Sequence, residues 1–545
     1  MNKNRTRGDA HGICKSIGSG KPCTQGEKCK FSHDRDAYLA SKPADLGDRC
    51  VMFDTQGRCT YGILCRFHKA HTDATGEQVV NETVAAAAQE TRLNTLSYDL
   101  MVGLRKHTVA TPRANEFITC MREEMKLLQV SSRAPPKTPE GAATADPADP
   151  TSTSTSNTPV DTATTTTAAE TGVVSSVGMD AYLKLAPREK KKALDFTDKL
   201  YLAPLTTVGN LPFRRICKGF GVDITCGEMA LTQNLLKGMR PEWSRINRHV
   251  SEDIFGVQLC ASFPDKLIQS AEIIQNHFDV DFVDINMGCP VDSVFDTGAG
   301  SALLGSKNKV RRMLQGLNYV LDCPVTVKLR NGIHNKQPIA HELLPQFEQW
   351  GASLATLHGR SRQQRYLKLA DWNYIKQCRE TLQEMPLFGN GDVLSWTDYY
   401  DQKEASGVAG IMIGRGALIK PWIFDEIKNR RHWDISSRER LDILREFTRY
   451  GMEHWGSDDM GVTNTRRFLL EWMSMLHRYI PVGLLEVLPQ KINERPPPFV
   501  GRDDLETLMA SSKVSDWLKL TEMMLGPTPA DFSFVPKHKS NSYEG

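Results

Sequence analysis

The chain has 545 residues, more than one hydrophobic core usually supports, so we expect two or three domains. Hydrophobic residues make up 40% of the chain and charged residues 24%. No apolar run approaches the roughly 18 residues that a membrane span requires, so we expect no membrane partner. The polar N-terminus leads straight into cysteines without the apolar stretch of a secretory signal, so secretion is not expected either.

Charge and cysteine usage narrow the class of protein further. The net charge of +3 says little, but residues 1–71 carry 13 Lys and Arg against 7 Asp and Glu. This excess suits a polyanionic partner, although charged faces are usually just solvated. Six of the 13 cysteines fall between Cys14 and Cys65 and the other seven are dispersed, which indicates reduced thiols and no disulfide framework. We expect a monomer in the cytoplasm and nucleus.

The first 75 residues have too few aliphatic side chains to form a core unaided, so a metal is the expected organiser. In residues 1–36, which we call finger 1, four ligands follow the spacing Cys-x8-Cys-x5-Cys-x3-His. Three thiolates and one imidazole are a set that tetrahedral zinc prefers. The predicted ligands are Cys14, Cys23, Cys29 and His33.

Residues 37–75, which we call finger 2, repeat the first two spacings with Cys50, Cys59 and Cys65. The fourth ligand departs from the pattern, because His68 follows after two residues and His71 after five. We favour His71, since the longer loop gives the chain room to turn back to the metal. The sequence therefore predicts two Zn²⁺ ions.

Aromatic and basic side chains are interleaved in both fingers, and small CCCH fingers present such side chains to unpaired bases. The alternative is that the aromatic rings form the fingers' own small cores. The residues concerned are Phe31, Phe53, Tyr61 and Phe67 among Lys28, Lys30, Arg58 and Arg66.

Two segments separate the fingers from the rest. Residues 76–130 are partly helical in pattern, with no evident chemistry. Residues 131–180 are rich in Ser, Thr, Ala and Pro and cannot bury enough apolar surface to offset the entropy of ordering them. We predict a disordered linker there, which tethers the fingers without fixing their position.

From residue 195 to about 425, eight short apolar runs alternate with helical patterns such as residues 265–278. Eight strand–helix units of this kind predict an α/β fold, a (β/α)8 TIM barrel, with a six-stranded doubly wound sheet as the alternative. Residues 430–545 predict a smaller helical domain, in which Arg466, Arg467 and Arg478 are interspersed among aromatic residues. The eight runs are KLYLAPL, VDITCGEM, IFGVQLC, DFVDINMG, PVTVKLR, LATLHGR, PLFGNGD and AGIMIGRG.

Reactive groups of a parallel barrel lie at the C-terminal ends of its strands, and the unusual residues of this sequence fall there. A lone Cys is usually a core residue and a lone Gly-x-Gly a turn, but here they occur at successive strand ends. Glycine loops after the seventh and eighth strands commonly hold a phosphate through backbone amides and a short helix N-terminus. The strand-end residues are 286–290, Lys328, 358–360, 390–392 and 414–416.

The run DINMGCP, with YLAPLTTVGNLPFRR before it and VTVKLR, LHGR, NGD and IGRGAL after it, resembles the tRNA-dihydrouridine synthase family over roughly residues 198–425. The two fingers, the linker and the tail from FLLEWMSML onward resemble its eukaryotic branch that acts on uridine 47 of tRNA. The resemblance implies FMN-dependent reduction of uridine to 5,6-dihydrouridine, with NADPH or NADH as reductant. No Rossmann fingerprint is present, consistent with a nicotinamide that binds transiently.

The resemblance also implies roles for individual residues. Cys289 falls on the proton donor, and a thiol suits this role if no nearby cation ionises it. Asn286 falls on the substrate-contacting asparagine, and the C-terminal helices on a tRNA-binding surface. Whether messenger RNA is also modified stays open. The implied FMN contacts are Ala203, Pro204, Leu205, Gln258, Lys328 and His358, with Asn390, Gly391, Asp392, Gly414 and Arg415 at the phosphate end.

Two other functions are compatible with parts of the sequence. A flavoprotein that acts on free pyrimidines would use similar barrel chemistry, but the fingers argue against it. A non-catalytic RNA-binding regulator would need only the fingers, but Cys289 and all the implied flavin contacts are present.

Overall fold

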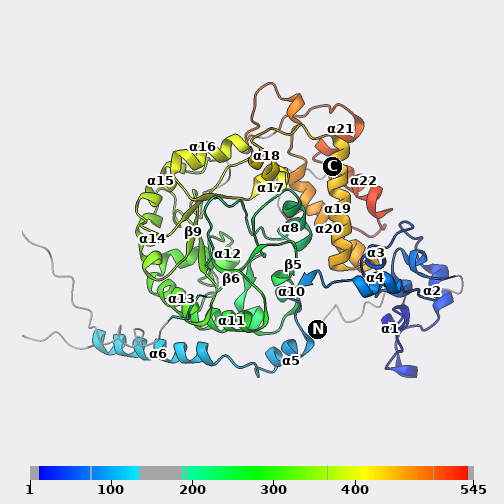
Figure 1. Cartoon of the computed structure of the whole chain (residues 1–545), viewed down its shortest axis with the longest axis horizontal. Helices are drawn as coiled ribbons and strands as arrows, with labels where there is room; N and C mark the ends of the chain where they lie inside the picture. Colours follow the sequence, from blue (N-terminus) through cyan, green and yellow to red (C-terminus); the bar gives the residue numbers. More distant parts are fainter. Residues whose placement is uncertain are drawn as a thin grey trace, which may run out of the picture.

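The computed structural model describes residues 12–73, 77–133, 187–190, 193–364, 366, 368–494 and 496–537, with side chains omitted at 127–133. It consists of a barrel, a helical domain beside it, and an N-terminal region that contacts both (Figure 1). The predicted linker of residues 131–180 lies outside the described residues beyond Arg133, where helix α6 (Pro112–Arg133) ends. None of the described helices combines the length and apolarity needed to cross a membrane.

Eight parallel strands form the barrel. Neighbouring strands pair in chain order, and pairing of the second strand with the third, Ile224 with Ile254, completes the ring. The predicted TIM barrel is thus confirmed, and the alternative of an open doubly wound sheet is wrong, because the sheet has no free edge. The strands are β2 (Tyr201–Leu202), β3 (Ile224–Cys226), β6 (Ile254–Cys260), β7 (Phe282–Met287), β8 (Val325–Arg330), β9 (Leu354–His358), β10 (Leu387–Asn390) and β11 (Gly410–Ile413).

One end of the barrel interior is filled by large side chains. Tyr201 packs edge-on against Phe282 and Phe388, with ring centroids 6.0 and 6.2 Å apart. Phe196, in the segment before β2, packs edge-on against Phe282 and belongs to the same cluster. Because these rings occupy the interior, open space is left only toward the C-terminal ends of the strands.

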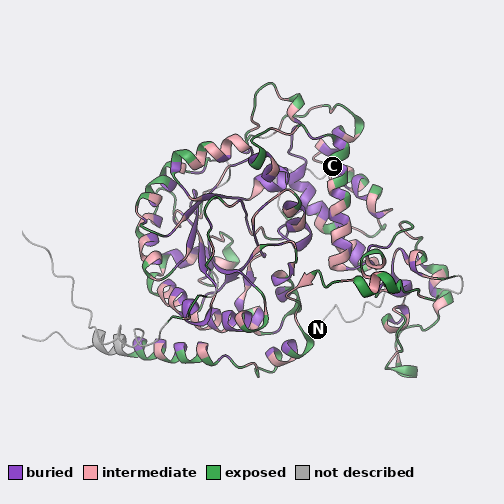
Figure 2. Cartoon of the chain, in the orientation of Figure 1, coloured by how far each residue is buried: buried purple, intermediate pink, exposed green. Residues whose placement is uncertain are grey.

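Helices surround the barrel and bury one face each (Figure 2). The face predicted for residues 265–278 is confirmed: Leu267, Ala271 and Ile274 are fully buried, and Phe278 is partly buried. The ring helices are α8 (Leu211–Gly219), α11 (Pro264–His277), α13 (Lys307–Val320), α14 (Ala340–Gln349), α15 (Trp372–Glu380), α16 (Trp396–Ser406), α17 (Arg415–Ile419) and α18 (Ile423–Asn429).

The helical C-terminal region is confirmed and is built on two long antiparallel helices, α19 (Ser437–Trp455) and α20 (Asp459–Leu476). It packs on the barrel through Trp472, whose indole N–H donates to Leu418 O at 2.9 Å. Its ring lies 5.2 Å from that of Phe213 on α8. Two shorter helices, α21 (Asp504–Ala510) and α22 (Val514–Leu525), complete the domain.

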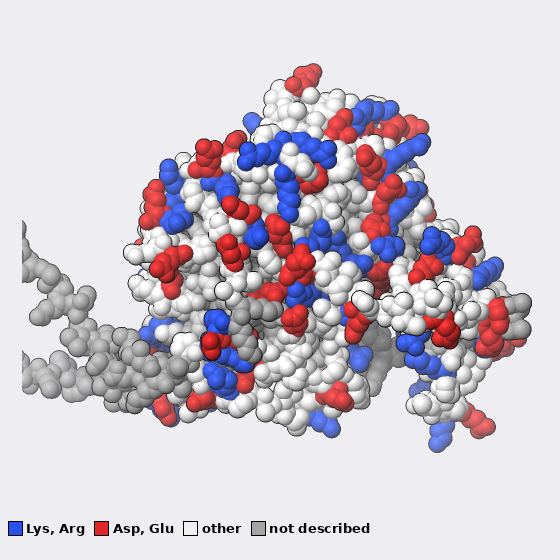
Figure 3. All heavy atoms as spheres, viewed as in Figure 1, with Lys and Arg blue, Asp and Glu red and all other residues white. Residues whose placement is uncertain are grey.

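Two of the three arginines noted in this region point inward and are structural. Arg466 is buried and donates to the carbonyls of Leu525 and Gly526 at the end of α22. Arg478 is also buried and donates to Ile492 O at 3.0 Å. Only Arg467 is exposed. Basic and acidic side chains are interspersed over the face shown in Figure 3, so no single basic stripe stands out there.

Residues 92–126 run along the outside of the barrel (Figure 1). The short strand β1 (Arg92–Leu93) pairs antiparallel with β5 (Arg248–His249), and α5 (Tyr98–Arg105) and α6 follow. Glu272 of α11 caps α6 by accepting from the backbone amides of Arg113 and Ala114. This segment therefore attaches the N-terminal region to the barrel before the predicted linker begins.

Finger 2 packs against the helical domain, so the expectation that the fingers are tethered without a fixed position is wrong for it. Its ligand cysteines and Phe67 share one buried cluster with Met452 of α19 and Val462 of α20. Arg66 of finger 2 pairs with Asp459 at 2.9 Å. Buried apolar contact of this kind outweighs the freedom that a linker would otherwise allow.

Candidate active site and metal centres

A cavity of about 410 Å³ opens at the C-terminal ends of the barrel strands, a size typical of small-molecule sites. All thirteen residues predicted for catalysis, substrate and cofactor line it, although they come from seven of the eight strands or the loops that follow. The residues are Ala203, Pro204, Leu205, Gln258, Asn286, Cys289, Lys328, His358, Asn390, Gly391, Asp392, Gly414 and Arg415.

A chain of hydrogen bonds leads from a buried carboxylate to the candidate proton donor. Asp284 accepts from Thr326 Oγ1 at 2.6 Å and from Gln258 Nε2 at 2.8 Å. Gln258 Oε1 accepts from Asn286 Nδ2 at 2.7 Å, and Asn286 Oδ1 accepts from the Cys289 amide at 3.0 Å. Burial raises the pKa of Asp284 to about 6, so the carboxylate is still mostly ionised at neutral pH.

The loop that carries Cys289 is held from two further directions. Arg330 Nε donates to Gly288 O at 2.8 Å, and Ser301 Oγ donates to Cys289 O at 2.8 Å. The Cys289 side chain itself is partly exposed and lines the cavity. The backbone is thus fixed while the thiol stays accessible, as a group that transfers a proton requires.

The residues after β10 and β11 form a cationic corner of the cavity. The Asp392 carboxylate binds Arg360 Nη2 at 2.6 Å and Arg415 Nη2 at 2.8 Å, and it also accepts from the Ala370 amide. Asp392 has a left-handed backbone, with φ of 55°, and these bonds stabilise it there. Its role is therefore to hold two guanidinium groups, because a carboxylate repels a phosphate.

This corner fits a phosphate group. Within the described residues, the backbone amides of Asp392, Gly414 and Arg415 have no hydrogen-bond acceptor. Asp392 is the only carboxylate among the residues that line the cavity. A side chain at Gly391 would meet Ala370 Cβ at 2.5 Å, so glycine keeps the loop close to the cavity. Free amides beside paired arginines are the chemistry that phosphate recognition uses.

Two basic groups near the centre of the site differ in charge state. Burial, and next the charge of Arg330, lower the pKa of Lys328 to about 8, so its ammonium is mostly protonated at neutral pH. Burial and the surrounding cations hold the pKa of His358 well below its usual range, so this imidazole is neutral. Arg360 Nη1 donates to His358 Nε2 at 3.3 Å, which leaves the ring proton on Nδ1.

Among the lining residues outside the predicted set, three carry a cation or an aromatic ring: Arg330, Arg360 and Tyr366. Arg330 follows Lys328 by two residues on β8 and so faces the same side of the strand, a signal that the sequence contained. Arg360 lies in the quoted LHGR motif, to which the resemblance gave no role beyond His358. Tyr366 had no signal; its half-exposed ring lies 4.2 Å from the Arg415 guanidinium carbon. The helical domain also contributes, because Asn493 Oδ1 accepts from Arg415 at 3.3 Å.

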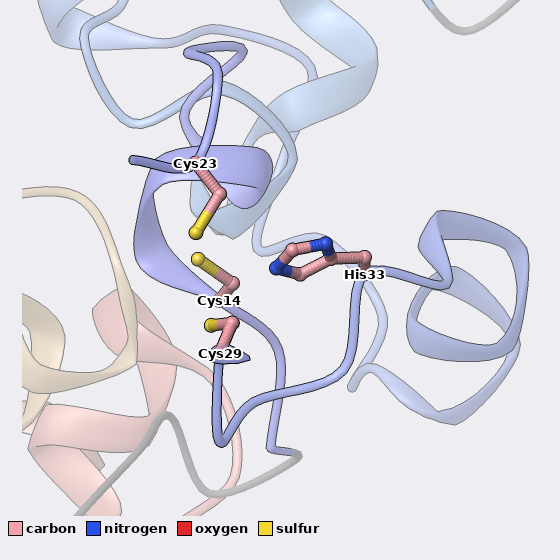
Figure 4. A group of neighbouring side chains, drawn as sticks. All are labelled: Cys14, Cys23, Cys29 and His33. Carbon is pink, nitrogen blue, oxygen red and sulfur yellow. The ribbon is translucent and has the colours of Figure 1, made fainter. Parts of the chain in front are cut away.

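The four predicted ligands of finger 1 converge on one point (Figure 4). Their sulfur and nitrogen atoms lie within 4.8 Å of one another. Cys14 immediately precedes α1 (Lys15–Gly18), and the other ligands lie in the loops around η2 (Gly26–Lys28). The His33 side chain is exposed. Three thiols and an imidazole at this spacing fit a tetrahedral zinc ion.

The second group contains one of the two candidate histidines of finger 2. Cys50, Cys59, Cys65 and His71 lie within 4.8 Å of one another and are all buried. Neither ring nitrogen of His71 has a hydrogen-bond partner within the described residues, and a buried imidazole of this kind fits a metal ligand. His68 instead lies 2.7 Å from Asp45 Oδ1, outside the group. The preference for His71 therefore agrees with the geometry.

The closed parallel barrel with a cationic cavity at its strand ends defines the chain as an enzyme of the TIM-barrel class. Comparison with known families is specific: residues 201–466 match the model described as dihydrouridine synthase (Dus), and residues 9–41 match the DUS3L CCCH zinc finger domain. The chain belongs to the dihydrouridine synthase family.

Its relatives are similar over nearly the whole chain. A human protein named "tRNA-dihydrouridine(47) synthase [NAD(P)(+)]-like" is 51% identical, covering 99% of this chain and 82% of the relative. The Arabidopsis thaliana protein of the same name is 42% identical, covering 96% and 83%. A Coprinopsis cinerea protein named "tRNA-dihydrouridine(47) synthase [NAD(P)(+)]" is 42% identical, covering 97% and 87%.

Proposed function

We propose that this protein reduces uridine to 5,6-dihydrouridine in tRNA, at position 47, with FMN as its flavin and NADPH or NADH as its reductant. One observation carries the proposal: Cys289 and all the implied flavin contacts line a single cavity in a chain of the dihydrouridine synthase family. The names of relatives at 42 to 51% identity support both the position and the nicotinamide.

The cavity offers a place for each part of the flavin. Ala203, Pro204 and Leu205 would face the ring system, and the free amides of the loops at Gly391 and Gly414 would bind the phosphate together with Arg415. Arg360 would add a second cation there. When bound, reduced FMN supplies a hydride for C6 of the uracil ring.

The chain's own residues supply the rest of the reaction. Adding a hydride at C6 builds negative charge on C5 and the C4 oxygen, and the Cys289 thiol donates the proton that C5 needs. Lys328, as an ammonium, and His358, through Nδ1–H, stabilise negative charge that develops on oxygen. The thiolate left at Cys289 regains its proton from solvent before the next turnover.

The fingers and the helical domain support an RNA substrate. Two groups of three cysteines and one histidine would each hold a Zn²⁺ ion. An enzyme for free pyrimidines needs no zinc-binding region of this kind. In this protein finger 2 packs directly on the helical domain. We therefore assign tRNA recognition to these parts.

The proposal is tested with an unmodified tRNA transcript and the purified, flavin-loaded enzyme. NADPH oxidation should be stimulated by the transcript and accompanied by one dihydrouridine per tRNA, and free uracil should give neither. A matched transcript with cytidine at position 47 should remain unmodified. Stimulation by free uracil, and none by tRNA, would instead favour the free-pyrimidine enzyme.

A further inference from the structure

Both fingers carry the same pair of residues after their third cysteine, a basic residue and then a phenylalanine. In finger 1 the pair is Lys30 and Phe31, which follow Cys29; in finger 2 it is Arg66 and Phe67, which follow Cys65. Phe31 is 39% exposed and Phe67 only 7%. Equivalent positions thus meet different surroundings in the two fingers, which makes the pair an internal comparison.

In finger 2 the pair is used for contact within the chain. Phe67 lies in the buried cluster with Met452 and Val462. Arg66 binds Asp459 through its side chain, and its backbone N–H donates to Ser457 O at 2.8 Å. The ring of Phe67 and the guanidinium of Arg66 therefore both contact the helical domain.

The metal site of finger 2 is itself part of this contact. Cys65 Sγ lies 3.1 Å from the Ser457 hydroxyl, between α19 and α20, so that with zinc bound the thiolate accepts from this hydroxyl. A side chain at Gly456 would meet the Tyr61 hydroxyl at 2.3 Å, and φ there is +111°. Glycine at this position lets a second aromatic ring of finger 2 approach α19.

Finger 1 presents its equivalent groups to solvent. Lys15, Lys28 and Lys30 flank the ligands Cys14 and Cys29, are exposed, and form no ion pair with any residue that the structure describes. Phe31 lies beside them with its ring exposed. An accessible aromatic ring among free lysines matches the surface on which an unpaired base stacks while cations contact its phosphates.

Finger 1 is attached to the rest of the protein through finger 2. Ile13 of finger 1 is buried in one cluster with Tyr38, Ile63 and Leu64 of finger 2. The start of finger 2, which continues directly from finger 1, is fixed by the buried Lys42, whose Nζ donates to Ile63 O at 2.8 Å. The position of finger 1 relative to the helices is therefore set by finger 2.

We propose that the two fingers have different tasks: finger 2 is a structural zinc module that mounts finger 1 on the α19–α20 pair, and Lys28, Lys30 and Phe31 of finger 1 take an unpaired nucleotide of the RNA. This division rests on the proposed function, since the RNA is the tRNA substrate. It predicts that substitution of the equivalent pair weakens RNA binding in finger 1 but lowers the stability of the fold in finger 2.

The test compares K30A/F31A with its equivalent R66A/F67A in the full-length, flavin-loaded protein. In K30A/F31A the Kd for an unmodified tRNA transcript should rise about 5- to 100-fold, the range expected for one lost base–aromatic stack, with unfolding temperature and zinc content unchanged. In R66A/F67A the unfolding temperature should fall. If R66A/F67A yields no soluble protein, Arg66→Ala alone should show the same fall, smaller in size.

The possible results distinguish failure of the two proposed finger tasks from failure of the proposed function in tRNA. Wild-type affinity for tRNA in K30A/F31A would overturn the assignment of the nucleotide to finger 1. A wild-type unfolding temperature in R66A/F67A would overturn the structural task of finger 2. A wild-type protein that itself binds no tRNA would contradict the proposed function.

Discussion

Asn286 Oδ1 accepts a hydrogen bond from the Cys289 backbone amide, at 3.0 Å. The side-chain amide of Asn286 is held in this orientation because its Nδ2 donates to Gln258 Oε1. The Nε2 of Gln258 in turn donates to Asp284. A carboxylate can only accept, so its charge sets the orientation of both amides in turn. Asp284, which does not line the cavity, thereby positions the loop of the candidate proton donor.

Replacing Asp284 with Asn should slow dihydrouridine formation on the order of tenfold to hundredfold. The new amide allows the side-chain amide of Gln258 to flip, and the Cys289 loop is then no longer held. NADPH-driven reduction of the bound flavin should persist. Burial raises the pKa of Asp284 to about 6, so the wild-type rate should fall as the pH drops through this value and the carboxylate is protonated. D284N should lack this acid limb. Single-turnover rates on tRNA across pH measure both effects.

A matched double variant distinguishes a lost orientation of the hydrogen-bond chain from general damage to the structure. In D284N/Q258E the donor and acceptor exchange places, so the carboxylate introduced at position 258 still accepts from Asn286 Nδ2 and the total charge is unchanged. The double variant should recover part of the rate that D284N loses. A wild-type rate in D284N, with the acid limb intact, would show that Asp284 has no positioning role.

Replacing Cys289 with Ala should abolish dihydrouridine formation while the protein stays yellow and NADPH still reduces the flavin. The reason is that only proton delivery to C5 is removed. Cys260 is a suitable control, because it is a buried thiol at the end of β6 that does not line the cavity. Cys260→Ala should keep wild-type turnover, and equal activity of both variants would remove the role of Cys289.

Lys328 should produce a basic limb in the pH profile of kcat/KM. Burial and the charge of Arg330 lower the pKa of this ammonium to about 8, so its positive charge is present below that pH and is lost above it. Activity should therefore decline as the pH rises through about 8. In Lys328→Arg the charge persists, and whatever activity remains should lack the decline. An unchanged basic limb in this variant would assign the limb to another group.

The site was predictable from the sequence because the C-terminal ends of parallel strands meet on one face of a barrel. Once the eight runs were recognised, residues as distant as Ala203 and Arg415 could be expected together, and they line one cavity. The inward direction of Arg466 was not predictable, because it depends on carbonyls at the end of α22. Docking of finger 2 was hidden for the same reason: Arg66 and Asp459 lie almost 400 positions apart.

The two candidate histidines of finger 2 give the sharpest test of its metal site. His71→Ala should reduce the zinc content from two ions to one, since it removes one of the four converging ligands. His68→Ala should keep both ions, because His68 is held by Asp45 at 2.7 Å. Metal analysis of the two purified variants distinguishes them, and loss of an ion from His68→Ala alone would reverse the assignment.

The same pair of variants links the metal to the fold. In small zinc modules the free energy of metal binding is also free energy of folding. The second metal group is buried against α19 and α20, so losing its ion exposes Phe67, Met452 and Val462 together. His71→Ala should therefore lower the unfolding temperature of the helical domain, and His68→Ala should lower it less. Equal unfolding temperatures for wild type and His71→Ala would mean that the contact with α19 and α20 forms without zinc.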